Sequence, residues 1–471
     1  MTRRFAVFGG SYNPAAEHHR SIAETLATCA DKSGTVRFDK TIVTPCGPRP
    51  DKATTNDIDP VHRAAMADMT FAGIPGIEVD LFDLELGTFT RTHALDERYA
   101  SREQGEAWHV IGSEFVAGGK SGESPIQREW LKGRELWERC NFAVIEREGY
   151  PCDPADLPPH HAVFAPARSG SSTSVRERAF KRQPLDGLVT PRVAAYMDRH
   201  NLYRGGVSSR MTVLSLAEPK ALIEFDARNP RAAALAARFE GYAASADEAN
   251  CIVTIGGDGT MLHAIRKHWR KRLPFVGVNA GHKGYLLNEA AELEDPSFLF
   301  DRLHCQLLPL LYVEREAPDG SVEGSYAFND AYVQYVEQAA WLEISVDGRV
   351  RIPKLVGDGA LASTAAGSTA YARSMGATPL LVDANAWMIV GNNVFEPRGW
   401  KSVPLSLASS AEFRSLDLGK RPISAFVDGA NMGRVAAMRV RVSRIAAVEL
   451  AFMPHRDMAA KLADDLFPPT A

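Results

Sequence analysis

The chain has 471 residues, of which 45% are hydrophobic and 24% are charged, and its formal net charge is −4 at pH 7. This composition is typical of a globular protein of two or more domains, and so small a net charge argues against a protein that wraps nucleic acid. No apolar stretch reaches the roughly 18 residues of a membrane span, so we expect neither nucleic acid nor a membrane as a partner.

The first half of the chain alternates between short apolar runs and helical patterns. An apolar run at Phe5–Phe8 stops at Gly9, which predicts a first strand rather than a signal peptide, and a helix is expected from about His19 to Ala30. Such alternation predicts a parallel α/β sheet with helices on its faces. The later expected elements are strands at Lys40–Val43, Trp108–Gly112 and Phe142–Ile145 and a closing helix at Val189–His200.

A small, polar segment from Tyr203 to Ser209 is typical of a linker, and it predicts domains at residues 1–205 and 210–471. Beyond about Leu307 the pattern changes to short alternating strands. We therefore expect an α/β lobe at about 210–305 and a β-rich lobe at about 306–471. In the second half as a whole, the expected elements are strands at Thr212–Leu216, Cys251–Ile255, Ala331–Tyr335 and Arg439–Val442 and a helix at Ala232–Tyr242.

The six cysteines are scattered, and no two of them have C-x-x-C spacing. We therefore expect no metal site, and thiols that stay reduced in the cytoplasm. They are Cys29, Cys46, Cys140, Cys152, Cys251 and Cys305.

The junction between the first strand and the first helix reads F-G-G-S-Y-N-P-A-A-E-H-H-R from Phe8 to Arg20. Glycines there let the backbone approach a phosphate, and the helix start offers free amide donors. The junction resembles the G-G-S-F-N-P-x-H-x-G-H signature of nicotinate and nicotinamide mononucleotide adenylyltransferases, with His19 at the last histidine. Ala16 replaces the first histidine, as in the eukaryotic branch of that family, and His18 replaces the glycine. Surface histidines at a helix start are the alternative interpretation.

Further segments resemble the same family in the same order. Lys52, followed by Arg63, resembles its K…R-x-x-M segment, and Ser171–Arg176 resembles S-S-T-x-I-R, which holds the ATP phosphates. Ile111–Glu114 stands for G-x-D with Glu in place of Asp. The resemblance implies a Rossmann-like nucleotidylyltransferase domain in which His19 is catalytic. The implied ATP- and mononucleotide-binding residues are Gly9, Gly10, Ser11, Tyr12, Lys52, Thr90, Gly112, Glu114, Trp130, Ser171, Ser172, Thr173 and Arg176.

In the second half, Ile255–Thr260 reads I-G-G-D-G-T between a buried strand and a helix expected to begin near Met261. A carboxylate is costly in a phosphate-binding loop, so Asp258 indicates a task such as holding Mg²⁺ or accepting a proton from a sugar hydroxyl. An ordinary glycine turn with a solvated aspartate is the alternative.

G-G-D-G-T is shared by NAD kinases, lipid kinases of the diacylglycerol and sphingosine group, and phosphofructokinases. Gly277–Leu286 resembles the G-x-N-x-G-x-L-G-F-L of NAD kinases, with Lys283 in place of Leu, and Asn329-Asp330 stands for their Asn-Glu pair. Gly357–Tyr371 and Val427–Gly429 match two later elements of that family. The resemblance implies an NAD kinase fold in which Asp258 is the general base. The implied NAD-binding residues are Gly257, Gly259, Thr260, Asn329, Asp330, Asp358, Thr369, Ala370, Tyr371 and Ser374.

Together the halves predict a bifunctional enzyme. The first half would transfer an adenylyl group from ATP to nicotinamide or nicotinate mononucleotide, and the second would phosphorylate NAD at the adenosine 2′-hydroxyl, with Mg²⁺ as cofactor and a homo-oligomer as the expected assembly. The alternatives are a catalytically degenerate, regulatory first half, a lipid substrate for the kinase, another acceptor such as phosphopantetheine for the first half, and polyphosphate instead of ATP as the phosphoryl donor.

Overall fold

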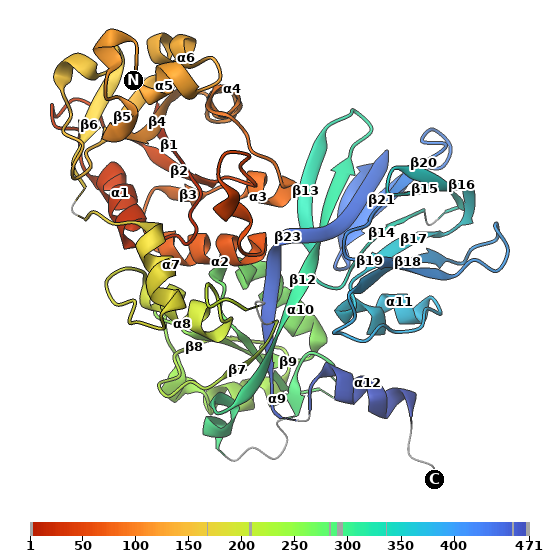
Figure 1. The fold of residues 1–471 in the computed structure, drawn as a ribbon. Helices are drawn as coiled ribbons and strands as arrows, with labels where there is room; N and C mark the ends of the chain where they lie inside the picture. The colour runs from red at the N-terminus through yellow and green to blue at the C-terminus, as the bar shows by residue number, and fades with distance from the viewer. Residues whose placement is uncertain are drawn as a thin grey trace. The chain divides into compact units, whose positions relative to one another are not determined.

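The computed structural model describes residues 3–166, 168–206, 210–281, 284–289, 295–335, 337–454 and 456–467. The chain divides into two compact units, Met1–Ser209 (unit 1) and Arg210–Ala471 (unit 2), and each is taken by itself (Figure 1). Among the helices of the described ranges, none is both long enough and apolar enough to cross a membrane.

Unit 1 contains the expected parallel sheet, with strand order β3-β2-β1-β4-β5-β6. This is the order of the doubly wound fold, in which ligands bind at the carboxyl ends of the strands where the order reverses. The reversal lies between β1 and β4, which are neighbours in the sheet (Figure 1). The strands are β1 (Arg4–Gly10), β2 (Lys40–Pro45), β3 (Ile77–Val79), β4 (Glu106–Gly112), β5 (Asn141–Ile145) and β6 (His161–Phe164).

In unit 1, capping side chains next to the helix starts decide where two of the helices begin. The first helix begins at Glu17, two residues before the expected start, because the side chain of His19 accepts the amide of Ala16. The closing helix begins at Pro191, because the Thr190 side chain caps it and proline suits the first helical position. The helices are α1 (Glu17–Thr28), α2 (Pro60–Phe71), α3 (Phe82–Leu86), α4 (Thr92–Glu103), α5 (Pro125–Glu129), α6 (Gly133–Arg139), α7 (Ser172–Phe180) and α8 (Pro191–Arg199).

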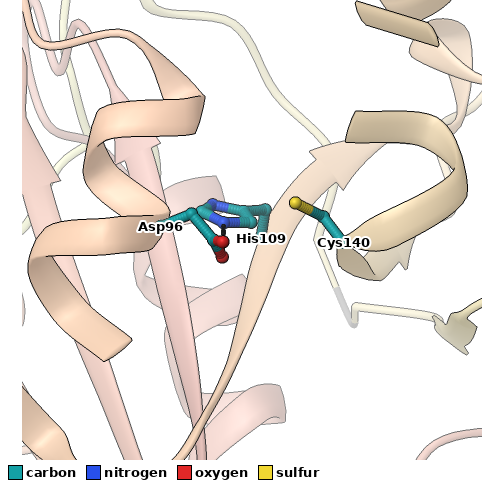
Figure 2. A group of neighbouring side chains, drawn as sticks. All are labelled: Asp96, His109 and Cys140. Atoms are coloured by element: carbon teal, nitrogen blue, oxygen red, sulfur yellow. Dashed lines mark hydrogen bonds and ion pairs between the residues drawn. The ribbon is translucent and has the colours of Figure 1, made fainter. Parts of the chain in front are cut away.

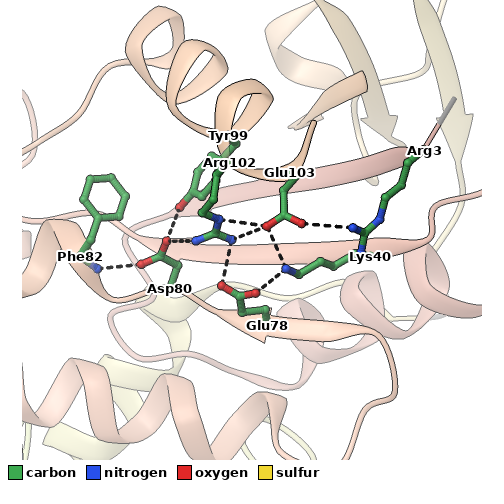
Figure 3. Close-up of polar contacts among 8 residues, drawn as sticks. All are labelled: Arg3, Lys40, Glu78, Asp80, Phe82, Tyr99, Arg102 and Glu103. Atoms are coloured by element: carbon green, nitrogen blue, oxygen red, sulfur yellow. Dashed lines mark hydrogen bonds and ion pairs between the residues drawn. The ribbon is translucent and has the colours of Figure 1, made fainter. Parts of the chain in front are cut away.

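A network of alternating charges joins the end of α4 to β2 and to the edge strand β3 (Figure 3). Lys40 Nζ lies 2.9 Å from Glu103 Oε1, and the Arg102 guanidinium lies 2.9 Å from Glu78 Oε1 and 2.7 Å from Asp80 Oδ2. Because every charge has a partner of opposite sign, the network holds the three-residue strand β3 in place.

Unit 2 contains an 11-stranded sheet with an α/β part and a six-stranded antiparallel sheet with the order β19-β18-β17-β14-β21-β22. In the α/β part, β8, β9 and β10 are parallel. Alternate residues of β9 face opposite sides, so Val253 packs in one core with α9 and Ile252 packs in another with α10. These elements are β8 (Ala221–Phe225), β9 (Cys251–Gly256), β10 (Phe275–Asn279), α9 (Pro230–Ala237) and α10 (Asp258–His268).

The expected boundary between lobes at about residue 306 falls within the long strand β12 (Leu303–Glu316). β12 pairs along its length with β23 (Ala437–Phe452), whose end also pairs with β10. The last strand thus returns to the α/β part. The remaining strands are β7 (Met211–Leu214), β11 (Asn288–Glu289), β13 (Val322–Ala327), β14 (Asp330–Gln334), β15 (Ala340–Val346), β16 (Arg349–Gly357), β17 (Gly359–Ser363), β18 (Ala386–Asn392), β19 (Ser402–Ser406), β20 (Ser410–Ser415), β21 (Ile423–Val427) and β22 (Ala430–Val435).

Two helices of unit 2 differ from expectation. α9 ends at Ala237, and a short 3₁₀ turn at Glu240–Tyr242 replaces the rest of the expected helix. α10 begins at Asp258 rather than near Met261. The candidate base therefore lies within the first turn of a helix, where the unpaired amides favour negative charge. Two short helices, α11 (Tyr371–Ser374) and α12 (Met458–Leu466), complete unit 2.

Candidate active sites

The carboxylate of Asp258 is held by the turn that follows β10. One oxygen accepts the amide of Tyr285 and the other accepts the amide of Leu286, both at 3.0 Å. Burial raises the pKa of Asp258, and the Leu286 amide and the charge of Lys461 offset part of that rise. The arrangement fixes a half-buried carboxylate in one orientation, as a general base requires.

The three glycines around Asp258 differ in whether a larger side chain would fit at their positions. A Cβ at Gly256 would lie 2.3 Å from Thr260 Oγ1, so close packing requires glycine there. A Cβ at Gly257 or Gly259 would meet no described heavy atom within 4 Å. The loop therefore leaves an open face beside the carboxylate where a phosphate could approach. His282 and Lys283 of the next motif lie outside the described residues.

Three motifs distant in sequence meet at the start of β14. The carboxylate of Asp428 accepts the amides of Phe328, Asn329 and Asp330 at 2.9, 2.8 and 3.2 Å. A Cβ at Gly367 would lie 2.1 Å from the carbonyl oxygen of Asn329, so the G-S-T-A-Y segment can pack there only because it begins with glycine. Sequence reasoning quoted Asp428 as a motif match but did not assign it a role.

The side chains of Asn329 and Asp330 include polar atoms that form no hydrogen bond with the rest of the described chain. Asn329 Oδ1 is buried without a hydrogen-bond partner among the described residues. Burial and the neighbouring Asp428 raise the pKa of Asp330 to about 7. A buried acceptor that lacks a donor is costly, so these groups indicate contacts that a ligand supplies.

The raised pKa of Asp330 predicts that it makes unit 2 less stable as pH increases. The folded state favours the protonated acid, whereas the unfolded chain ionises near pH 3.9, so this contribution is full below about pH 4 and is lost by about pH 7. Asp330→Asn mimics the protonated acid. We expect the variant to gain a few kcal/mol of unfolding free energy over the wild type between pH 5 and pH 8, measured by urea unfolding. Parallel pH profiles for the wild type and Asp330→Asn would contradict this, and exposed Asp383→Asn is the control.

The other residues predicted to bind NAD are more dispersed. Thr369 and Tyr371 are half-buried, and Ala370 and Ser374 are exposed beside them. Asp358 does not join the Asn329–Asp330 cluster. It precedes β17, whose Gly359 pairs with Gln334 while Ser363 pairs with Asp330, so Asp358 lies more than one strand length, roughly 17 Å, from the pair. Its carboxylate accepts a hydrogen bond of 2.7 Å from Asn393.

In unit 1 a cavity of about 1270 Å³ lies at the carboxyl ends of β1 and β4, where the doubly wound fold binds ligands. Its volume is ample for a nucleotide together with a second substrate. Of the residues predicted to bind ATP or mononucleotide, those that line the cavity are Gly9, Gly10, Thr90, Gly112, Glu114, Trp130 and Ser171, together with His19.

The remaining predicted residues do not line the cavity, but they form hydrogen bonds within the signature loop or with groups that contact it. Tyr12 is buried in the core, and its hydroxyl donates to the Phe8 carbonyl at 2.7 Å. Lys52 Nζ donates to Ser11 Oγ at 2.8 Å. The guanidinium of Arg176 donates to the Asn13 carbonyl at 2.7 Å and to Thr173 Oγ1 at 3.1 Å, and the Ser172 hydroxyl donates to the Pro14 carbonyl at 2.9 Å.

Sequence reasoning quoted Arg63 but did not assign it to the site. Arg63 is buried and donates to the carbonyls of Ser11, Cys46 and Thr55, with distances of 2.7 Å to Cys46 and 3.2 Å to Thr55. A buried guanidinium that donates to three backbone carbonyls, and also to the Cys46 sulfur, fixes the loop. The sequence signal that could have assigned Arg63 to the site was its position in the K…R-x-x-M match.

The two adjacent histidines lie together in the cavity. His19 Nδ1 accepts the amide of Ala16 at 3.2 Å, which leaves Nε2–H as the donor that a ligand can use. Burial and the neighbouring cations lower the pKa of His19 well below its usual value. Successive helical residues are expected to diverge by roughly 100°. Even so, the ring centroids of His18 and His19 lie 3.9 Å apart, and both side chains line the cavity.

A polar group of three residues, Asp96, His109 and Cys140, also lies in unit 1 (Figure 2). Their ligand atoms lie within 4.8 Å of one another, close enough for a metal ion. However, Asp96 Oδ1 is hydrogen-bonded to His109 Nε2 at 2.9 Å, and Asp96 Oδ2 lies 3.4 Å from Arg139. Burial raises the pKa of the Cys140 thiol to about 11. Internal bonds and a protonated thiol explain the group as a buried polar contact between α4 and β4.

Comparison with known proteins supports the reading of unit 2. The profile of the ATP-NAD kinase N-terminal domain family matches residues 207–299. The NAD kinase of Cereibacter sphaeroides is 34% identical over 224 residues, 47% of this chain and 87% of that protein. The NAD kinase of Xanthomonas oryzae is 32% identical over 241 residues, 50% of this chain and 91% of that protein.

Among solved structures, yeast NADH kinase complexed with NADH matches with a TM-score of 0.49 and 16% identity, over 56% of this chain and 92% of that chain. The family profile falls on the segment that carries Asp258 and its glycine loop. Because identity above 30% extends over 87% to 91% of the relatives' length, the chain belongs to the NAD kinase family.

Proposed function

We propose that the chain is a bifunctional enzyme of pyridine nucleotide biosynthesis. Unit 2 would phosphorylate NAD at the adenosine 2′-hydroxyl, and unit 1 would transfer an adenylyl group from ATP to nicotinamide or nicotinate mononucleotide. The observation that carries the kinase reaction is the Asp258 carboxylate, oriented by two amides beside open glycines at a helix start. A cytoplasmic homo-oligomer is part of this proposal.

In the kinase reaction, Asp258 accepts the proton of the 2′-hydroxyl as the oxygen attacks the terminal phosphorus of ATP. One P–O bond forms, the bond to ADP breaks, and NADP and ADP leave. Amides at the start of α10 stabilise negative charge that develops on the phosphate. Asn329 and Asp330 supply buried polar contacts to the nucleotide.

In unit 1, a phosphate oxygen of the mononucleotide attacks the α-phosphorus of ATP and pyrophosphate leaves. The reaction needs no covalent enzyme intermediate, so unit 1 contributes positioning and charge stabilisation. The Nε2–H of His19 is the available donor toward the transferring group, because Nδ1 is occupied by the Ala16 amide.

Magnesium fits both sites as an ion that arrives with the phosphates. Both Asp258 oxygens already accept amides, so Asp258 fits an ion shared with ATP rather than one enclosed by protein ligands. In unit 1, Glu114 Oε2 is buried without a partner among the described residues and lines the cavity. When bound, Mg²⁺ neutralises phosphate charge.

One observation favours the alternative in which unit 1 only binds nucleotide. Glu114 replaces the expected aspartate, and its other carboxylate oxygen is paired with Arg147. A carboxylate paired in this way is less free to serve a metal or a substrate. This alternative retains the cavity as a regulatory site.

The test uses the purified full chain with ATP and Mg²⁺. Nicotinamide mononucleotide, nicotinate mononucleotide and NAD are added separately, and products are identified by mass. We expect NADP from NAD and a dinucleotide from at least one mononucleotide. No NADP with either ATP or polyphosphate would overturn the kinase proposal. NADP without a dinucleotide would overturn the adenylyl transfer proposed for unit 1 and favour the alternative of a binding module.

A further inference from the structure

The last helix of the chain contacts the turn that holds the candidate base. Lys461 of α12 donates hydrogen bonds through Nζ to the carbonyl of Gly284, at 2.8 Å, and to that of Leu287. Between these two carbonyls the same turn supplies the amides of Tyr285 and Leu286 to Asp258. One half-buried ammonium group therefore ties both ends of a four-residue turn whose middle binds the carboxylate.

A second contact of α12 reaches the same turn. Asp465 lies one helical turn after Lys461 and pairs with Arg373 of α11 at 3.1 Å. Arg373 also donates to the hydroxyl of Tyr285 at 3.0 Å. The Asp465 side chain is 13% exposed and the Arg373 side chain is 41% exposed, so solvent screens this ion pair in part. α12 thus joins the Asp258 turn to the helix that follows the G-S-T-A-Y segment.

The charges around Lys461 favour this arrangement. Burial lowers the pKa of Lys461, while the negative charges of Glu289, Asp258 and Asp457 offset part of that decrease and act to keep the ammonium group protonated. In return, the positive charge of Lys461 offsets part of the rise that burial causes in the pKa of Asp258. Electrostatic coupling therefore accompanies the mechanical contact.

We propose that Lys461 is a positioning residue of the kinase reaction, which clamps the Gly284–Leu287 turn so that its amides hold the Asp258 carboxylate toward the substrate hydroxyl. The proposal rests on the proposed role of Asp258 as general base. Lys461 reaches the reaction only through this turn and through its charge. No residue pattern in the sequence links the last helix to the G-G-D-G-T loop, about 200 residues earlier.

The test compares Lys461→Met with Lys461→Arg in the full chain. A loose base costs rate rather than binding, so we expect Lys461→Met to lower kcat for NADP formation by roughly 10–100-fold with little change in KM for NAD. Loss of the positive charge raises the pKa of Asp258, so the acidic limb of the kcat profile should move to higher pH. Arginine retains the charge and two donors, so Lys461→Arg should recover much of the rate and the original limb.

Matched variants separate the possible outcomes. Asp464→Asn, exposed on the same helix, should behave as wild type. Asp465→Asn should lower kcat moderately and provides a second test if Lys461→Met does not fold. Unchanged kcat and an unmoved acidic limb in Lys461→Met would overturn the clamp, as would equal losses in the Met and Arg variants without a pH shift. An active Asp258→Asn enzyme would instead overturn the base itself.

Discussion

Asp258→Asn is expected to reduce NADP formation by about 10²–10⁴-fold while NAD still binds, because loss of a general base typically costs that much. Asparagine has nearly the same shape but cannot take the ribose proton. Its NH₂ group also meets one of the two amides that now donate to the carboxylate, at Tyr285 and Leu286. The turn would therefore lose one hydrogen bond as well as the base.

The measurement pairs initial rates of NADP formation with calorimetric binding of NAD. Exposed Asp383→Asn is the control for a change of charge. Activity within a few-fold of wild type would remove Asp258 from the mechanism. Loss of NAD binding along with activity would show that Asp258 acts mainly in binding.

His19→Gln is expected to lower adenylyl transfer by about 10²–10³-fold, the usual cost of losing one donor to a charged reacting group. Glutamine at the third helical position can still accept the amide of the residue that precedes the helix, so the start of α1 should persist. NADP formation by unit 2 should be unchanged. Pyrophosphate release with each mononucleotide measures the effect.

His18→Ala is the informative partner of this variant. Side chains of successive helical residues point in directions that differ by roughly 100°, which by itself would leave most of the activity to His19. Since the rings lie 3.9 Å apart in the cavity, we now expect a loss of roughly 10-fold, as for a weakened hydrogen bond to a charged group. A greater loss in His18→Ala than in His19→Gln would place the main donor at His18. If neither change affects transfer, the cavity catalyses by other groups.

Much of the fold could be predicted from short-range patterns. Apolar strands that end in glycines at Gly10 and Gly256 identified both strand–loop–helix junctions, because strand periodicity and glycine freedom are local properties. The motif order from Gly256 to Gly429 likewise indicated the NAD kinase family, to which the chain belongs. Element ends were less predictable, since side-chain caps such as that of His19 decide them.

What the sequence determined by itself was therefore the parallel α/β sheet, the identity of the candidate base, and the family of unit 2. Only the tertiary structure showed that Asp428 holds the Asn329–Asp330 backbone, that His18 lies beside His19, and that Lys461 holds the turn beneath Asp258. The reason is sequence distance. Contacts between residues 99 or 177 positions apart arise from how strands such as β12 and β23 return through one sheet, and no local periodicity records that path.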